Sequence, residues 1–316
     1  MAHLVVSNAD ARRLFLDRHA LRERAGHRLT PDDVLALIRR LGFVQLDSIN
    51  VLERAHHMIL FSRAAGYERE LLSALHHDHR SLFEQWTHDA SLLPIEFYPH
   101  WHHRFRDAKT RLSEPRWLLR LAGDPAKAIA RVRRRIRTEG ALAARDFEDK
   151  GEGSWWGWGP SKTALEYLWR AGELAVARRD GFEKVYDLTE RVIPAGLREA
   201  RPTRKQTVDW ACCQALAHLG FATPSEIAGF FDLANIAEAR DWARAALRKK
   251  QIVEIGVTAV DGSVKPAFAR PSIDADIAAL PPSPGAARFL SPFDPAIRDR
   301  KRALRLFGFD YRIEVF

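Results

Sequence analysis

The stretch IVEIGVTAVDGSVKPAFA, Ile252 to Ala269, consists of two strand-like runs around the pair Asp261-Gly262. An Asp-Gly pair between two such runs predicts a β-hairpin with a tight turn. Helical patterns precede this hairpin over 207–219, 224–231 and 236–249. Three helices followed by a β-ribbon are the plan of the winged helix, a variant of the helix-turn-helix motif.

A similar order of elements recurs, more loosely, at two earlier places in the chain. The first copy has helices near 9–19 and from Thr30 to Gly42; Thr30 can cap the second helix, Pro31 suits its first turn, and Gly42 can end it. In the second copy we expect helices over 126–138, 142–149 and 162–172. Apolar β-like stretches follow them and are broken at Asp180-Gly181. The chain is therefore predicted to be mainly α-helical with small β-ribbons.

The run FVQLDS, Phe43 to Ser48, follows the helix that ends at Gly42. Its alternation predicts a short strand in which Gln45 and Asp47 point to one face while Val44 and Leu46 point to the other. An amide and a carboxylate placed side by side on a rigid element can position a water against an electron-poor carbon. A half-buried strand with a polar outer face is the alternative interpretation.

Four stretches resemble the YcaQ-like DNA glycosylases, winged-helix enzymes that excise alkylated purines and unhook interstrand crosslinks. They are FVQLDSINVLERAHHMILFSR (43–63), SWWGWGPSKTALEYLWRAGELAVARR (154–179), VYDLTERVIP (185–194) and LSPFDPAIRDRKRALRLFGFDYRIEVF (290–316). This resemblance implies tandem winged-helix units around a basic cleft. We expect a first unit over 1–123 with a His- and aromatic-rich insertion at 66–123, a second over 124–200, a third over 201–275 and an extension over 276–316. Since family chains usually continue beyond the last motif, we expect either a fragment or a short member.

The resemblance also implies a hydrolytic mechanism with Asp47 and Gln45 as the catalytic residues. A purine alkylated at N7 is cationic, so its glycosidic bond can break without a general acid. Asp47 would stabilise the sugar cation and accept a proton from water, while Gln45 would hold that water. No lysine is placed to form a Schiff base, so we expect no strand cleavage. Glu53 and His56 would lie one helical turn apart behind the pocket, or be ordinary helix residues.

Basic residues give the chain a formal charge of +9 and a pI near 9.8, which favours polyanionic partners. Two arginine-rich runs are the candidates for contacts with double-stranded DNA, although a merely solvated helix surface would look the same. The expected DNA-binding residues are Arg131, Arg133, Arg134, Arg135, Arg137, Arg298, Arg300, Lys301 and Arg302, with Lys162 at a helix start and Asp261 and Gly262 at the hairpin tip.

Other features limit the remaining possibilities. The two cysteines, Cys212 and Cys213, are adjacent, which suits neither a disulfide framework nor a metal knuckle. Histidines gather at 56–57, 76–79 and 100–103 without a zinc-binding pattern, so we expect no metal and no cofactor. The tryptophans at 155–158 could plug a core or face a lesion. We expect a monomer in the cytoplasm, without membrane contact; a non-enzymatic DNA-binding regulator is the alternative function.

Overall fold

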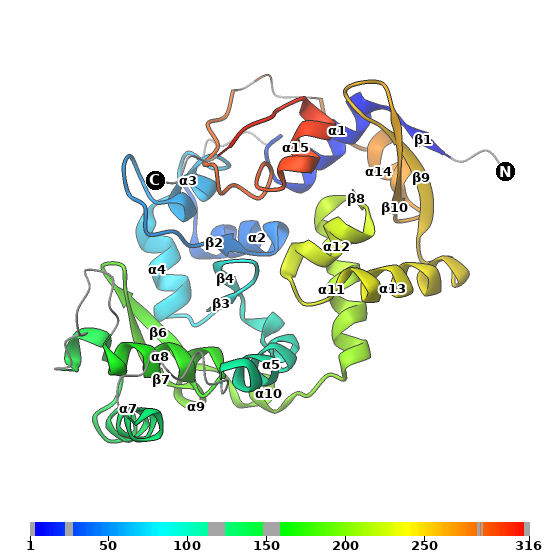
Figure 1. Ribbon diagram of the computed structural model, residues 1–316. Coiled ribbons are helices and arrows are strands. Elements are labelled where there is room, and N and C mark those ends of the chain that lie inside the picture. The colour runs from blue at the N-terminus through cyan, green and yellow to red at the C-terminus, as the bar shows by residue number, and fades with distance from the viewer. Residues whose placement is uncertain are drawn as a thin grey trace. The chain divides into compact units, whose positions relative to one another are not determined.

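The computed structural model describes residues 4–22, 28–112, 124–147, 159–282, 285 and 287–312. The chain divides into two compact units, each built from separate segments (Figure 1). The first unit comprises Met1–Arg69, Thr87–Leu92 and Thr203–Phe316, and the second comprises Glu70–Trp86 and Leu93–Pro202. The predicted division of the chain into segments at 1–123, 124–200, 201–275 and 276–316 stays a prediction. The tryptophan loop at 155–158 and the end of the last motif at 313–316 lie outside the described residues.

The hairpin predicted around Asp261-Gly262 is confirmed. Strands β9 (Val253–Thr258) and β10 (Val264–Ala269) pair antiparallel, and Gly262 adopts a φ of +81° at the tip. Strand β8 pairs with β10, and β1 pairs in parallel with β9, which completes a four-stranded sheet in the order β1-β9-β10-β8. The other elements here are β1 (Val5–Val6), α11 (Arg204–Leu219), β8 (Phe221–Ala222), α12 (Pro224–Phe231) and α13 (Ile236–Arg248).

Local sequence signals explain where the helices of the first unit begin. Thr203, Thr223 and Asn235 form capping boxes at the starts of α11, α12 and α13. Thr30 does the same for α2 with Asp33, and Gly42 ends this helix at a φ of +87°, so both predicted ends are confirmed. The remaining elements of this unit are α1 (Asn8–Arg18), α2 (Pro31–Leu41), β2 (Val44–Gln45), α3 (Ala55–Phe61), α14 (Ile273–Ala278) and α15 (Arg300–Phe307).

An aromatic cluster supports the start of β2. The ring of Phe43 lies 5.4 Å from that of Phe230 and 6.1 Å from that of Phe231, both on α12. The Arg298 guanidinium stacks on the same Phe43 ring at 5.0 Å from its centroid. Because Phe43 is fully buried in this cluster, the strand that follows it has a fixed position.

The second unit contains a three-stranded sheet in the order β5-β7-β6. The helix predicted over 142–149 is wrong, because Leu142–Ala143 forms β5 and pairs with β7 before one turn of 3₁₀ helix. The predicted insertion at 66–123 supplies α4 (Arg69–His77), β3 (Leu82–Trp86), β4 (Ala90–Pro94), η1 (Ile95–Trp101) and α5 (His102–Leu112). The other elements are α7 (Pro125–Glu139), η2 (Ala144–Asp146), α8 (Pro160–Arg170), β6 (Leu174–Asp180), β7 (Glu183–Leu188), α9 (Thr189–Val192) and α10 (Ala195–Glu199).

The hydrophobic core of the second unit forms where α7 and α8 cover this sheet. Val132 and Ile136 of α7 and Leu165, Leu168 and Trp169 of α8 are fully buried in one cluster. Their spacing of three or four residues places each set on one helix face, so the opposite face of α7 carries its arginines toward solvent.

None of the described helices is long and apolar enough to span a membrane.

Candidate active site

Strand β2 carries the predicted catalytic pair into the first unit. It pairs antiparallel with β4, with Val44 opposite Leu92 and Gln45 opposite Ser91. One further bond, from the Leu46 amide to the Ala90 carbonyl at 2.8 Å, continues this ladder. Val44 and Leu46 are buried, as predicted, at 0% and 5% exposure. The strand is shorter than the predicted run, because β2 ends at Gln45.

The register of this ladder brings a second carboxylate to the site. The ladder ends with the bond between Leu46 and Ala90, and Asp47 and Asp89 are the next residues on the two segments. The charge of Asp47 acts on the Asp89 carboxyl, so the two side chains lie close together. Gln45 and Ser91 lie two residues away on the same face. Four polar side chains therefore share one face of β2 and the turn before β4.

The Gln45 amide is held at both ends. His88 Nε2 donates to Gln45 Oε1 at 2.9 Å, and Gln45 Nε2 donates to Asp89 Oδ2 at 3.2 Å. Gln45 is only 4% exposed, so its amide is buried, whereas Asp47 is partly exposed. Its bonding explains the burial, because a buried amide needs partners for its polar groups. In this structure the amide orients Asp89.

The turn that carries His88 and Asp89 is itself hydrogen-bonded. The Thr87 amide donates to the Asp89 carbonyl at 2.9 Å, and the Thr87 hydroxyl lies 3.1 Å from His88 Nδ1. The Thr87 hydroxyl also donates to the Asp89 carbonyl at 3.2 Å. Asp89 Oδ1 also accepts from the Ala90 amide at 2.8 Å. Both oxygens of the Asp89 carboxylate are thus fixed in place.

The Asp47 carboxylate lies just beyond the end of β2. It is partly exposed, and its Oδ1 accepts from the Ile49 amide at 2.7 Å in a local turn. Burial, together with the negative charge of Asp47, raises the pKa of Asp89 above its usual value, although the Ala90 hydrogen bond opposes this change. The loop that follows exposes Val51 and Leu52 at 95% and 86%, so no described part of the chain covers it.

Glu53 and His56 do not lie one helical turn apart, because α3 begins only at Ala55. Glu53 pairs with Arg69 before the helix, and its Oε1 accepts from the Arg54 amide at 2.8 Å. His56 is buried at 4% exposure, and its ring lies 4.3 Å from that of His57. Glu53 therefore fastens the end of the loop, while His56 packs inside the first unit.

The arginines of α7 fall into two groups. Arg133 pairs with Glu173 at 2.6 Å, Arg135 pairs with Glu139 at 2.6 Å, and Arg131 donates to the Ser161 hydroxyl at 2.6 Å. Arg134 and Arg137 are exposed, and neither side chain forms an ion pair with a described residue. The carboxylates of Glu173 and Glu139 neutralise Arg133 and Arg135, so Arg134 and Arg137 are better placed than these two to bind a polyanion.

The second basic run, predicted to contact DNA, contains both buried and exposed side chains. Arg302 is 2% exposed, donates to the carbonyls of Leu219 and Phe221 at 3.0 Å each, and pairs with Glu226 at 3.2 Å. Its prediction as a DNA-binding residue is wrong, because the guanidinium serves the interior of the first unit. Arg300 and Lys301 are exposed.

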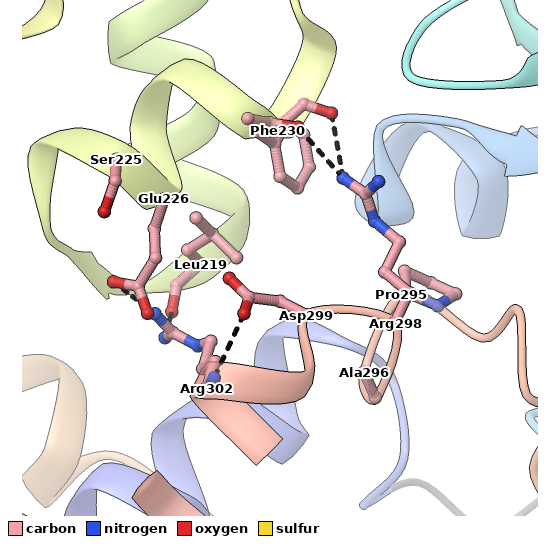
Figure 2. A pocket seen from close by; sticks show the side chains of 10 residues that line it. Leu219, Ser225, Glu226, Phe230, Pro295, Ala296, Arg298, Asp299 and Arg302 are labelled. Atoms are coloured by element: carbon pink, nitrogen blue, oxygen red, sulfur yellow. Dashed lines mark hydrogen bonds and ion pairs between the residues drawn. The ribbon is translucent and has the colours of Figure 1, made fainter. Parts of the chain in front are cut away.

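Arg298 and Arg302 line a pocket of about 220 Å³ between α12 and the segment before α15 (Figure 2). Arg298 donates to the Phe230 carbonyl at 3.0 Å, and burial lowers its pKa to about 10. Burial opposes ionisation of Glu226, yet Arg302 and Arg305 hold the pKa of this carboxyl below its usual value. The charges around the pocket thus compensate one another, which favours a packing junction over a phosphate site.

Two further predicted contacts lie on exposed positions. Lys162 is exposed in the first turn of α8. At the hairpin tip, Asp261 accepts from the Ser263 amide and hydroxyl at 2.9 and 2.7 Å, which lowers the pKa of its carboxyl. Val260 and Val264 flank the turn at 51% and 52% exposure. The tip therefore presents apolar side chains around a small polar turn.

No group of three or more His, Cys, Asp or Glu side chains within the described ranges is placed to hold a metal ion. The two cysteines are both free thiols, Cys212 buried and Cys213 exposed.

Sequence reasoning missed Asp89 and His88, because they lie in the insertion whose topology we did not predict. A usable signal was present. The runs LFEQW and ASLLP, at 82–86 and 90–94, flank a short polar stretch, a pattern typical of two strands joined by a turn. Pairing the second run with FVQLDS would have placed Asp89 beside Asp47.

Comparisons with known proteins agree with this fold. The profile of the family described as DNA glycosylase AlkZ-like matches residues 38–316. Among solved structures, the Streptomyces sahachiroi DNA glycosylase AlkZ superposes with a TM-score of 0.62 at 17% identity, over 92% of this chain and 77% of that one. At this identity the superposition shows a shared fold. The match to the family profile spans β2, the Asp89 turn and all later elements, so the chain belongs to the AlkZ-like DNA glycosylase family.

Proposed function

We propose that this DNA glycosylase excises purines alkylated at N7 from double-stranded DNA, including purines tethered in interstrand crosslinks. The observation that carries the proposal is the partly exposed Asp47 carboxylate on a fixed strand end, next to an uncovered loop. A carboxylate in this position suits a substrate that needs charge stabilisation and a base, and needs no acid.

The chemistry follows from the positive charge of the substrate. When the bond between C1′ and N9 breaks, its electron pair neutralises the alkylpurine, which leaves as a free base. The sugar develops positive charge, which Asp47 opposes. A water oxygen then bonds to C1′ while its proton passes to a carboxylate. The products are the alkylated base and an abasic site in an intact strand.

A crosslinked purine cannot easily rotate out of the helix, because it is bonded to the opposite strand. A site at the exposed end of a short strand can approach such a nucleotide from a groove. We propose that the hairpin tip at Asp261-Gly262 assists by probing the duplex with Val260 and Val264, because minor-groove proteins insert apolar side chains in this way.

The order of elements supports a tandem winged-helix architecture, which we propose for residues of both units. Along the chain, the sequence helix, short strand, two helical elements and two strands occurs three times, beginning at α2, α7 and α11. In each copy the short strand pairs with the last strand: β2 with β4, β5 with β7, and β8 with β10. We also propose that the enzyme acts as a monomer, since tandem units in one chain need no symmetric partner, and that it acts in the cytoplasm.

A non-enzymatic DNA-binding regulator would share the basic charge and the helix-turn-helix elements. A regulator would not need the two neighbouring carboxylates of Asp47 and Asp89. Membership of a DNA glycosylase family favours the enzyme over the regulator.

The proposed substrate class is tested by incubating the protein, without metal, with a duplex that contains N7-methylguanine and with a duplex crosslinked through N7 positions. We expect release of the free base and formation of abasic sites in the first, and unhooking of the second. Undamaged DNA is the control. Base release from neither damaged duplex, with binding retained, would contradict the proposed substrate.

The double variant Arg134→Ala/Arg137→Ala should bind damaged and undamaged duplexes more weakly. Both guanidiniums are exposed and without ion pairs in the described structure, so they can neutralise phosphates. The slope of log affinity against log salt should fall by about 0.9 for each phosphate that is no longer neutralised, as a salt titration of binding measures. Excision at saturating protein should persist, because phosphate contacts position the duplex and take no part in bond breaking.

Arg133→Ala is the matched control on the same helix, since this arginine is paired with Glu173. It should leave the salt slope almost unchanged. Equal slopes for the double variant and the wild-type protein would show that the free face of α7 is only solvated.

A further inference from the structure

Asp47 and Asp89 lie just beyond the paired ends of β2 and β4, and the charge of Asp47 acts on the Asp89 carboxyl. Two like charges held close together repel each other, so this pair is electrostatically unfavourable. The Asp89 carboxylate is nevertheless held by two donors, the Ala90 amide at 2.8 Å and Gln45 Nε2 at 3.2 Å. Such a preorganised and unfavourable pair is typical of a functional site.

We propose that Asp89 is a second catalytic carboxylate of this enzyme, which holds the attacking water together with Asp47 and accepts its proton. This inference rests on the proposed hydrolysis and adds a residue to it. Gln45 and His88 are then positioning residues, since they act through Asp89 and make no contact with the substrate.

The geometry divides the work between the two carboxylates. Asp47 is partly exposed at the strand end, where the sugar of a bound nucleotide can reach it. Asp89 is fixed through both oxygens, and each carboxylate oxygen can accept more than one hydrogen bond. A water between the two side chains can therefore donate to both. As its oxygen bonds to C1′, one proton moves to Asp89, and no other reactant is required.

The surroundings of Asp89 suit its carboxylate to accepting a proton. Burial raises its pKa, and the charge of Asp47, on the opposite segment of the ladder, raises it further. His88, on the same turn, is hydrogen-bonded to the Gln45 amide oxygen through Nε2. A proton acceptor works best when its pKa lies near the operating pH, so the shift favours Asp89 for this role.

The Gln45 amide keeps Asp89 in this position. A glutamine amide can rotate by half a turn, which would present Oε1 to the carboxylate. The His88 bond to Oε1 at 2.9 Å opposes that rotation, so an N–H continues to face Asp89 Oδ2. This arrangement gives a reason for an amide, and not a second carboxylate, at residue 45.

The test compares single-turnover base release by wild-type protein and Asp89→Asn across acidic to neutral pH, on a duplex with N7-methylguanine. At neutral pH the variant should be slower by about a hundredfold, with nearly unchanged DNA affinity. The wild-type rate should fall with acidity as Asp89 becomes protonated, above the usual range of an aspartate. In the variant this acidic limb should be lost, because the side chain at residue 89 no longer titrates.

The conservative variant Asp89→Glu should recover part of the rate, which a purely structural role would not predict. Asp78→Asn, which removes an exposed carboxylate just beyond the end of α4, is the matched control and should match the wild-type protein. An Asp89→Asn protein with wild-type rate and pH profile would overturn the proposal while leaving the glycosylase function intact. If this variant does not fold, the proposal for Asp89 is overturned equally by a wild-type protein whose rate does not fall at a pH above the usual range of an aspartate. Failure of the substrate proposal would instead appear as no base release by the wild-type protein.

Discussion

Asp47→Asn is expected to reduce base release from alkylated DNA by about a hundredfold or more, the usual combined contribution of a general base and a stabilising charge. The substitution keeps the shape of the side chain, and an asparagine oxygen can still accept from the Ile49 amide. What disappears is the negative charge that opposes the sugar cation. Single-turnover kinetics on an N7-methylguanine duplex measure the reduction.

The DNA affinity of this variant should stay close to that of the wild-type protein, because the Asp47 carboxylate does not bind the phosphates of the duplex. Asp78→Asn again serves as the control for removal of one negative charge. Unchanged excision by Asp47→Asn would refute the role of Asp47 in the mechanism and would leave Asp89 as the candidate catalytic group.

Local signals in the sequence were sufficient where a structure depends on neighbouring residues. The Asp261-Gly262 turn, the Thr30 cap and the Gly42 helix end were all predicted correctly, since each depends on the backbone preferences of a few residues. The burial of Val44 and Leu46 followed from alternation for the same reason. These features were enough to place the candidate Gln45 and Asp47 pair at a strand.

Long-range pairing was the information that the sequence did not supply. Asp89 reaches the site only because β4 pairs with β2, and nothing in either run specifies that partner. The burial of Gln45 depends on its two hydrogen-bond partners, His88 and Asp89, which lie far from it in the sequence. Likewise, Arg302 lies in a basic run, but its burial depends on Glu226 and two carbonyls from a distant part of the chain. Charge clustering alone cannot separate a DNA contact from a buried ion pair.

A fully buried ion pair fastens the segment after α3 to the C-terminal part of the first unit. Arg63 Nη1 and Nη2 donate to Asp294 Oδ2 and Oδ1 at 2.6 and 2.8 Å, and the two side chains are 1% and 0% exposed. Arg63 also donates to the carbonyls of His19 and Ile59 at 2.9 Å each. Each charge is therefore neutralised by the other and by nearby dipoles.

Asp294→Ala is expected to lower the free energy of unfolding by about 3 to 5 kcal/mol, because it leaves the Arg63 cation buried without its counter-ion. Urea unfolding followed by tryptophan fluorescence measures the change as a shift of the midpoint. Asp276→Ala is the matched control: this carboxylate pairs with Arg18 at 2.7 Å, but both side chains are about 30% exposed, at 32% and 28%, so its removal should cost at most about 1 kcal/mol. Equal midpoints for the two variants would show that burial adds nothing to the Arg63 pair. Neither Arg63 nor Asp294 belongs to the candidate active site around Asp47. The folded fraction of Asp294→Ala should therefore excise alkylated purines at the wild-type rate.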